Sequence, residues 1–474
     1  MKTVEFRLTE KPVINPYRGW ITYGLAEPFE FIMDRVSVGY TRFCWKDIEP
    51  AEGCYNWEPI EKFLNSYAKY GKQASFGILY MSSGSKEDLF PDYLKHCGID
   101  MREIQYYENI GMVEKIALTP CHDDPIFFAK LSKFMQAVAE KYDGDPRVAY
   151  IDIRSLGNWG EGHSILFRRP EFRRETVRMH YQMHRDLFHK TDIVMPWGEE
   201  QYQEIYEEFV EKGFGLRRDG LMGNATGTEI FPAMGKAPGV FEFWGGYELT
   251  CHYNWFDGGK TEVFDYGKDP SEASDLAYYF PKEARSWWPK GNEVHAWHCG
   301  GNGYQDSILL GRPTHIPLCG AHDCKLMWEE RRPFIERWTN EVGYAFLMEA
   351  ACFDEEPQDG VLRVRAMWKN HGISMLYKPA CPVVVLVDSE GRVAASKTVA
   401  NLNFAKVMPR LYREMDTYLP VDGVPAGEYD LYIGVGKPGE TFLPGQPLPE
   451  AFIQTVSEGT HRNRWLFLSH LSWK

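Results

Sequence analysis

Two glutamates stand where a carboxyl group could carry acid–base chemistry. Glu161 lies in the segment Asp152-Ile-Arg-Ser-Leu-Gly-Asn-Trp-Gly-Glu-Gly-His163, where the flanking glycines let the backbone turn sharply. Glu242 interrupts the apolar run Val240-Phe-Glu-Phe-Trp244, and an unpaired carboxylate in such a run would be costly. Cleavage of a glycosidic bond needs two carboxyl groups, one to protonate the leaving oxygen and one to act as nucleophile or base. The pair therefore indicates glycoside hydrolysis.

Each glutamate also has a structural explanation that the sequence leaves open. Glu161 could cap backbone N–H groups of its own loop, and Glu242 could pair with an arginine inside the fold. Glu199 is the reserve candidate if Glu242 proves structural. Arg18 and Arg42 could orient the nucleophilic carboxylate through a bidentate contact, or could form ion pairs in the core.

The aromatic content is high, at 15% of 474 residues, with 15 Trp, 27 Tyr and 28 Phe. A flat indole suits stacking on the C–H face of a pyranose while its N–H bonds a hydroxyl. Five tryptophans lie at or just beyond the end of an expected strand: Trp45, Trp159, Trp197, Trp244 and Trp297. Any one of them fits a core position equally well, but their equivalent positions favour a sugar-binding cleft.

Four further polar side chains are candidates for bonding sugar hydroxyls, namely Asn158, His163, His295 and His298. The three histidines, with Asp152, are also of the types that bind a metal ion in a barrel hydrolase. A hydrogen-bonded structural histidine is the commoner role for each, and we expect neither a metal nor a cofactor.

The elements that must position these residues follow from the pattern of the chain. Short apolar runs alternate with helical patterns, which is typical of βα units and a parallel sheet. Asp124-Pro125 is expected to open a helix, with the acid as N-cap. The expected strands cover residues 19–23, 40–45, 74–80, 148–154, 192–197, 220–223, 239–244 and 293–298. They predict an α/β fold, a (β/α)8 TIM barrel over residues 1–343 with its active site at the carboxyl ends of the strands.

From about Tyr344 the pattern changes to β runs, as at 361–368, 382–387 and 428–434, divided by turn signals such as Asn370-His-Gly372. We therefore predict an all-β sandwich domain over residues 344–474, appended to the barrel. This domain could bind glycan or support the barrel, and support is the expected role.

Charge and composition exclude several classes. With 53 Lys+Arg against 67 Asp+Glu, the net charge of −14 disfavours a nucleic-acid partner. Arg217 and Arg218 could recognise an anionic sugar, although paired arginines are usually solvated.

The sequence shows no apolar leader and no run of about 18 apolar residues, so we expect a cytoplasmic protein without a membrane partner. Ten cysteines without a C-x-x-C spacing indicate reduced thiols, and a homo-oligomer is left open.

Two motifs carry a resemblance to a known family. The segment Val38-Gly-Tyr-Thr-Arg-Phe-Cys-Trp-Lys-Asp-Ile-Glu-Pro-Ala-Glu-Gly-Cys-Tyr-Asn-Trp57 resembles the early-strand motif of clan A retaining glycoside hydrolases, which include the β-galactosidase-like TIM barrels. The start Asn15-Pro-Tyr-Arg-Gly19 and the loop Gly-Asn-Trp-Gly-Glu161 resemble a narrower bacterial group of glycosidase-like barrels with a C-terminal β-sandwich. The resemblance covers about residues 12 to 440.

The resemblance implies a retaining mechanism, with the acid/base after the fourth strand and the nucleophile after the seventh. Carried onto this sequence, these roles fall to Glu161 and Glu242. The clan usually has Asn directly before the acid/base, whereas here Gly160 precedes Glu161 and Asn158 lies three positions back. The expected partner is a carbohydrate substrate. The alternatives are a non-catalytic glycan-binding barrel and a metal-dependent barrel hydrolase.

Overall fold

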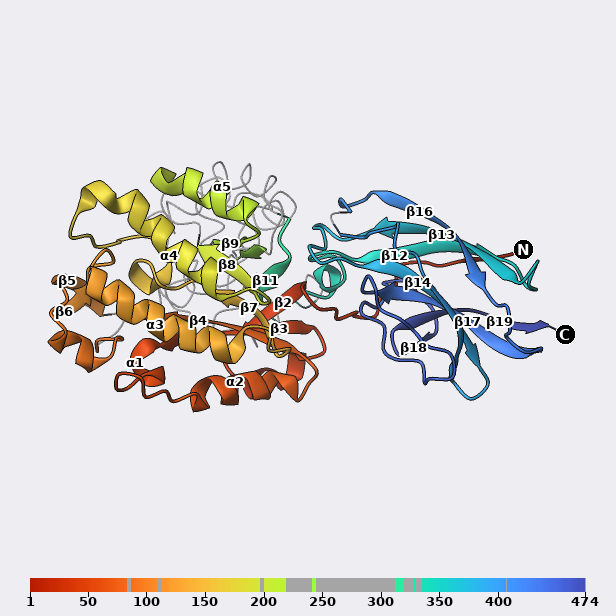
Figure 1. The fold of residues 1–474 in the computed structure, drawn as a ribbon, viewed down its shortest axis with the longest axis horizontal. Helices are drawn as coiled ribbons and strands as arrows, with labels where there is room; N and C mark the ends of the chain where they lie inside the picture. Colours follow the sequence, from red (N-terminus) through yellow and green to blue (C-terminus); the bar gives the residue numbers. More distant parts are fainter. Residues whose placement is uncertain are drawn as a thin grey trace, which may run out of the picture. The chain divides into compact units, whose positions relative to one another are not determined.

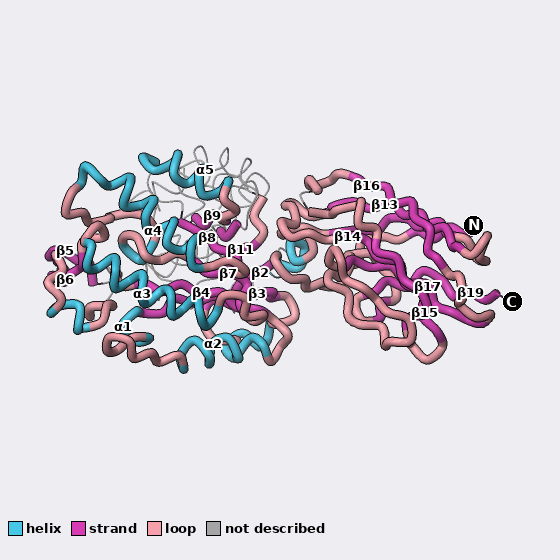
Figure 2. Tube along the Cα trace, viewed as in Figure 1, coloured by secondary structure: helices cyan, strands magenta, loops and turns pink. Residues whose placement is uncertain are grey.

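The computed structural model describes residues 1–82, 87–108, 113–196, 200–218, 241–243, 312–318, 328, 332, 335–405 and 407–473. The chain forms two compact units, one of Met1–Gly19 with Pro333–Lys474 and one of Trp20–Arg332. Helices alternate with strands in the Trp20–Arg332 unit, whereas strands predominate in the other (Figures 1 and 2). Among the described helices, none combines the length and apolar character needed to cross a membrane.

A curled parallel sheet lies at the centre of the Trp20–Arg332 unit. Its strands hydrogen-bond side by side in the order β10-β11-β2-β3-β4-β7-β8-β9, and the sheet closes because β9 also pairs with β10. Their bounds are Gly19–Tyr23 (β2), Val36–Cys44 (β3), Gln73–Leu79 (β4), Val148–Asp152 (β7), Asp192–Pro196 (β8), Gly215–Arg218 (β9), Phe241–Phe243 (β10) and His315–Pro317 (β11). Counted from β2, β7 is the fourth strand and β10 the seventh.

The sixth and eighth strands differ from the prediction. The sixth is β9 instead of 220–223, and β11 takes the place expected for 293–298; both expected segments lie outside the described residues. The strands β9 and β11 are only four and three residues long and include Arg217, Arg218 and His315. Such short runs with charged residues lack the apolar signal by which a strand is found.

Helices lie against the outside of the curled sheet (Figure 1). As predicted, α3 begins after Asp124, whose side chain accepts hydrogen bonds from the N–H groups of Ile126 and Phe127. The helices are α1 (Trp45–Ile48), α2 (Glu58–Ala68), α3 (Pro125–Tyr142), α4 (Arg173–Leu187) and α5 (Gln203–Glu211). A hairpin of β5 (Met101–Glu108) and β6 (Val113–Pro120) precedes α3. The complete (β/α)8 alternation stays a prediction, because most of the chain between β9 and β11 lies outside the described residues.

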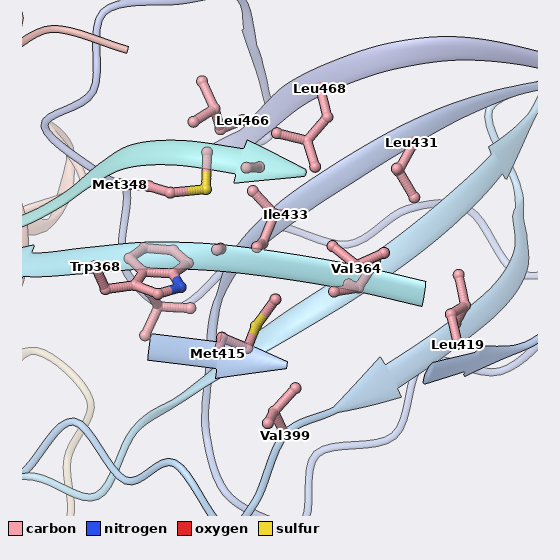
Figure 3. Packing of buried hydrophobic residues seen from close by; sticks show 14 of the residues in the cluster. Met348, Val364, Trp368, Val399, Met415, Leu419, Leu431, Ile433, Leu466 and Leu468 are labelled. Atoms are coloured by element: carbon pink, nitrogen blue, oxygen red, sulfur yellow. The ribbon is translucent and has the colours of Figure 1, made fainter. Parts of the chain in front are cut away.

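Two antiparallel sheets form the other unit, in the orders β1-β12-β13-β16 and β15-β14-β17-β19-β18. The first consists of Lys2–Glu5 (β1), Phe346–Phe353 (β12), Val361–Asn370 (β13) and Tyr412–Pro420 (β16). The second consists of Cys381–Asp388 (β14), Val393–Thr398 (β15), Gly427–Gly436 (β17), His461–Arg462 (β18) and Trp465–Trp473 (β19). Alternate side chains of both sheets meet in one core, which includes Trp368, Ile433 and Leu466 (Figure 3).

The N-terminal residues contribute to this second unit. Strand β1 pairs antiparallel with β12, from Lys2 opposite Phe353 to Glu5 opposite Ala350. The predicted division at residues 343 and 344 assigned this segment to the barrel. The local sequence does not reveal that β1 pairs with β12, because the partner strand lies more than three hundred residues away in the sequence.

The core around Trp368 yields a stability prediction. Trp368 is 1% exposed and lies edge-to-face with Phe404 at 5.1 Å between ring centroids. Trp368→Ala should lower the free energy of unfolding by about 3–5 kcal/mol, through lost burial and the remaining cavity. Urea denaturation measures the change. The exposed Met367→Ala on the same strand is the control, and equal losses for the two variants would contradict the prediction.

Candidate active site

Glu161 lies in a tightly turned loop that follows β7. The backbone angle φ is positive at Gly157 (73°), Trp159 (52°), Gly160 (67°) and Gly162 (75°). Glycine adopts this region without strain, whereas a non-glycine residue there is strained, and such strain is concentrated at functional sites. Trp159, next but one before Glu161, is therefore held in its conformation by its surroundings.

Close packing requires glycine at two positions of this loop. A Cβ atom on Gly157 would lie 2.0 Å from the carbonyl oxygen of His163, and one on Gly160 would lie 2.5 Å from Cα of Arg154. The guanidinium of Arg154 in turn donates from Nη1 to the carbonyl oxygen of Trp159, at 3.1 Å. The glycines that suggested a sharp turn in the sequence are thus needed for backbone-to-backbone contact.

The carboxylate of Glu161 is 17% exposed and is surrounded by basic groups. Arg42, on β3, donates from Nη1 to Oε1 at 3.1 Å. Arg154 Nη1 lies 3.7 Å from the same oxygen, and His163 Nε2 lies 3.5 Å from Oε2. The indole of Trp159 is 36% exposed and meets the His163 ring edge-to-face, at 5.8 Å between centroids. Four predicted site residues, Arg42, Trp159, Glu161 and His163, are therefore brought together.

A fully buried charge cluster lies beside Glu161. Asp152 accepts from Arg154 Nε at 2.5 Å and from Arg217 Nε at 2.9 Å, and Tyr40 donates its hydroxyl to the same carboxylate. The side chains of Asp152, Arg154 and Arg217 are all 0% exposed. Burial raises the pKa of Tyr40 well above its usual range. Arg217, expected to be solvated, is instead an internal ion-pair partner.

Arg217 also connects this cluster to the strand of the second glutamate. Its Nη2 donates to the carbonyl oxygen of Gly160 at 3.2 Å. In the sheet ladders Arg217 stands opposite Glu242, and Glu242 stands opposite His315 on the other side. The structure thus fixes the backbone of Glu242 on the seventh strand, while its side chain lies outside the described residues.

Arg154 and Tyr40 of the cluster were not predicted, although the sequence carries a signal for them. Side chains two apart on a strand point to the same face. Tyr40 and Arg42 have this spacing, as do Asp152 and Arg154, and both pairs stand in runs that are otherwise mostly apolar. Polar pairs of this kind indicate charges inside a barrel.

Three buried histidines lie near the Glu161 loop and were also not predicted. His180 donates from Nε2 to the carbonyl oxygen of His122 at 3.0 Å, and its Nδ1 lies 3.2 Å from Ser155 Oγ. His184 donates to the carbonyl oxygen of His180 at 2.9 Å. Burial lowers the pKa of His122 and of His184 to about 4, and that of His180 to about 3.

Two predicted sugar-facing residues prove to be structural. Trp45 is 0% exposed, its ring stacks on Phe134 at 5.1 Å, and its Nε1 donates to Glu49 at 2.7 Å. Arg18 is 1% exposed and donates from Nε to the carbonyl oxygen of Val342 at 2.7 Å; burial lowers its pKa to about 10. Neither side chain is available to a sugar or to a catalytic carboxylate.

Asn158 is 7% exposed, and its backbone joins the loop through a hydrogen bond from its N–H to the carbonyl oxygen of His163, at 2.9 Å. The remaining predicted site residues lie outside the described residues: Trp197, Glu199, Trp244, Trp297 and His298. So does His295, one of the candidate ligands of the metal-dependent alternative.

The described residues give the metal-dependent alternative no support. Within the described ranges, no group of three or more His, Cys, Asp or Glu side chains is arranged to hold a metal ion. Asp152, proposed as a ligand for it, has both carboxylate oxygens bound by arginines. A ligand in that position would have to displace a buried ion pair.

Comparisons with solved structures find glycoside hydrolases. The chain is similar to a psychrophilic family 10 endo-β-1,4-xylanase, at 11% identity over 48% of this chain and 71% of that chain, with a TM-score of 0.30. It is similar to a GH42 β-galactosidase from G. stearothermophilus, at 12% identity over 44% and 41% of the two chains, with a TM-score of 0.29. It is also similar to endo-glycoceramidase II from Rhodococcus sp., at 10% identity over 88% of this chain and 99% of that chain, with a TM-score of 0.38. No family model matches the chain, and neither does any curated protein.

The buried cluster predicts a large effect of a single substitution. Asp152→Asn would leave two buried guanidinium groups without their carboxylate, so we expect the free energy of unfolding to fall by about 3–5 kcal/mol. Urea denaturation followed by tryptophan fluorescence measures it. Asp186→Asn, on the exposed side of α4, should have little effect. A D152N protein as stable as D186N would contradict the account of the cluster.

The buried histidines predict a loss of stability in acid. Their pKa values lie below the ordinary value near 6.5, so the unfolded chain binds protons that the folded chain does not. The free energy of unfolding that depends on these neutral histidines is fully present above pH 6.5. It is lost as the pH falls toward the folded-state pKa values, about 4 for His122 and about 3 for His180. For His122 the loss is roughly 3 kcal/mol.

Thermal unfolding at pH 7.5 and pH 4.5 tests this prediction. His180→Gln should narrow the difference in melting temperature between the two pH values, whereas the exposed His189→Gln should leave it as in the unaltered protein. An H180Q protein that keeps the full acid sensitivity would show that other groups cause it.

Proposed function

We propose that the chain is a glycoside hydrolase that cleaves an oligo- or polysaccharide with retention of configuration, Glu161 acting as acid/base and Glu242 as nucleophile. The proposal includes a complete (β/α)8 barrel and a β-sandwich built from the two antiparallel sheets. Trp159, Asn158, His163 and Arg42 would belong to the substrate-binding or positioning groups, together with the predicted residues outside the described ranges.

The observation that carries the proposal is the contrast between two carboxylates at the end of β7. Asp152 is fully buried and bound by two arginines, whereas Glu161 keeps 17% exposure. Trp159 is exposed on the same loop, and its ring packs edge-to-face on His163, whose Nε2 lies 3.5 Å from Glu161. A partly exposed carboxyl group held in a fixed orientation on a loop with an exposed indole is suited to a sugar and its glycosidic oxygen.

The position of Glu242 supports the second role. The fourth and seventh strands of a closed eight-stranded sheet lie on different sides of its mouth, and β7 and β10 occupy these positions. A retaining mechanism needs the two carboxyl groups about 5–5.5 Å apart across the scissile bond. Arg217 on β9 stands opposite Glu242 in the backbone ladder, and its side chain bonds the Glu161 loop, so β9 connects the two candidate residues.

In the proposed reaction, the Glu242 carboxylate attacks the anomeric carbon while Glu161 gives its proton to the departing glycosidic oxygen. This forms a glycosyl–enzyme ester and releases the leaving sugar. Glu161 then takes a proton from water, whose oxygen attacks the anomeric carbon and releases Glu242. Arg42 orients the Glu161 carboxyl group through its hydrogen bond to Oε1.

A panel of aryl glycosides that differ in sugar and anomer tests the proposal. On a substrate that is turned over, Glu161→Gln should lower kcat roughly 10²–10⁴-fold, the usual contribution of a general acid–base. Glu242→Gln should be at least as impaired. A 2-fluoroglycoside of the same sugar should label Glu242, as detected by mass spectrometry of the digested protein.

Glu140→Gln, an exposed glutamate on α3, is the matched control and should keep full activity. Near-normal turnover in E161Q or E242Q would remove that residue from the mechanism. Binding of oligosaccharides without turnover by the unaltered protein would favour the glycan-binding alternative.

A further inference from the structure

One buried imidazole bonds the Glu161 loop at two points. The backbone N–H of Gly157 donates to His122 Nε2 at 2.9 Å. On the other side of the ring, His122 Nδ1 lies 3.1 Å from the carbonyl oxygen of Leu166. Gly157 and Leu166 stand on either side of Glu161 in the sequence, so a single side chain ties both arms of the loop that carries it.

The partners of His122 determine its tautomer. A backbone N–H can only donate, so Nε2 must be the nitrogen without a proton. A neutral imidazole then has its proton on Nδ1 and donates it to the carbonyl oxygen of Leu166 at 3.1 Å. The backbone nitrogen of Leu166 lies 3.2 Å from the same Nδ1, which in this tautomer has no lone pair left to accept its N–H. If Nε2 carried a proton, its N–H would face the backbone N–H of Gly157, and neither group could accept a hydrogen bond from the other. The arrangement therefore requires the neutral ring.

The His122 residue is itself held through its backbone. The backbone N–H of His122 donates to the carbonyl oxygen of Leu166 at 2.9 Å, and the carbonyl oxygen of His122 accepts from the side chain of His180 on α4. The next residue, Asp123, accepts from the N–H groups of Arg168 and Arg169, at 2.6 Å and 2.8 Å. These bonds anchor the far end of the loop to the segment before α3, so the ring has little freedom to move.

We propose that His122 is the positioning residue of the candidate active site, fixing the Glu161 loop from its outer side by bonding Gly157 and Leu166. The inference rests on the proposed function for its catalytic consequence. Its structural content stands without that function. The titratable groups facing the ring are Tyr80, after β4, and His180 on α4, with Asp123 adjacent in the chain.

Hydrogen exchange of the full chain, with no substrate present, is the first test. His122→Ala should raise the exchange rates of the Gly157 and Leu166 amides roughly tenfold, as expected for the loss of a hydrogen-bond acceptor or of the ring that orders the arm. His122→Gln keeps an acceptor near the position of Nε2 and should restore slow exchange at Gly157. His184→Ala removes another buried histidine, which is not bonded to the loop in the described contacts, and should leave both amides protected.

Kinetics on a turned-over aryl glycoside is the second test. H122A should lower kcat roughly 10- to 100-fold with a smaller change in KM, because a displaced Glu161 is misaligned for proton transfer. H122Q should recover part of kcat, whereas H184A should keep kcat near that of the unaltered protein.

Unchanged exchange at Gly157 and Leu166 in H122A would overturn the proposal, as would equal acceleration in H184A. Faster exchange in H122A in a protein without glycosidase activity would support the positioning role and refute the proposed function. Faster exchange with unaltered kcat would refute the link between loop order and catalysis.

Discussion

The salt bridge of Asp152 with two arginines is the interaction on which the candidate site depends. Ion pairs in a protein interior persist only when every charge has partners, because each ion has lost its hydration. Here the carboxylate comes from β7, one arginine follows it and the other comes from β9, while Tyr40 adds a bond from β3. The same two arginines donate to backbone carbonyl groups of the Glu161 loop. The interior of the curled sheet and the conformation of the loop are therefore set together.

The loop is consequently held from two sides with different chemistry. On the inner side, charged guanidinium groups bond its carbonyl oxygens, and on the outer side a neutral imidazole bonds its arms. Glycine at positions 157 and 160 lets the backbone approach these neighbours. Glu161 is left partly exposed at the tip of a loop that has few ways to move. Such preorganisation is what an acid–base group needs to act at a fixed distance from its substrate.

The sequence predicted those elements whose signal is local. Apolar runs located most strands of the curled sheet, and the Asp124 cap located the start of α3. It failed where the deciding partner is distant in the sequence. Trp45 stands at a strand end like Trp159, but α3 covers its ring. Position 217 resembles a loop residue in the sequence, because the charge of Arg217 is neutralised only in the fold, by Asp152. Arg18 resembled a site residue since its partners are backbone carbonyl groups, which carry no sequence signal.

The pairing of β1 with β12 has a consequence for how the chain is made. The first strand of the two-sheet unit leaves the ribosome before any of the Trp20–Arg332 unit, and its partner strand follows only after that whole unit. The early strand must wait without its partner, its backbone groups bonded to water, whereas the strands of the parallel sheet follow one another within the intervening unit. Synthesis therefore favours an order in which the intervening unit closes first and the two ends of the chain meet last.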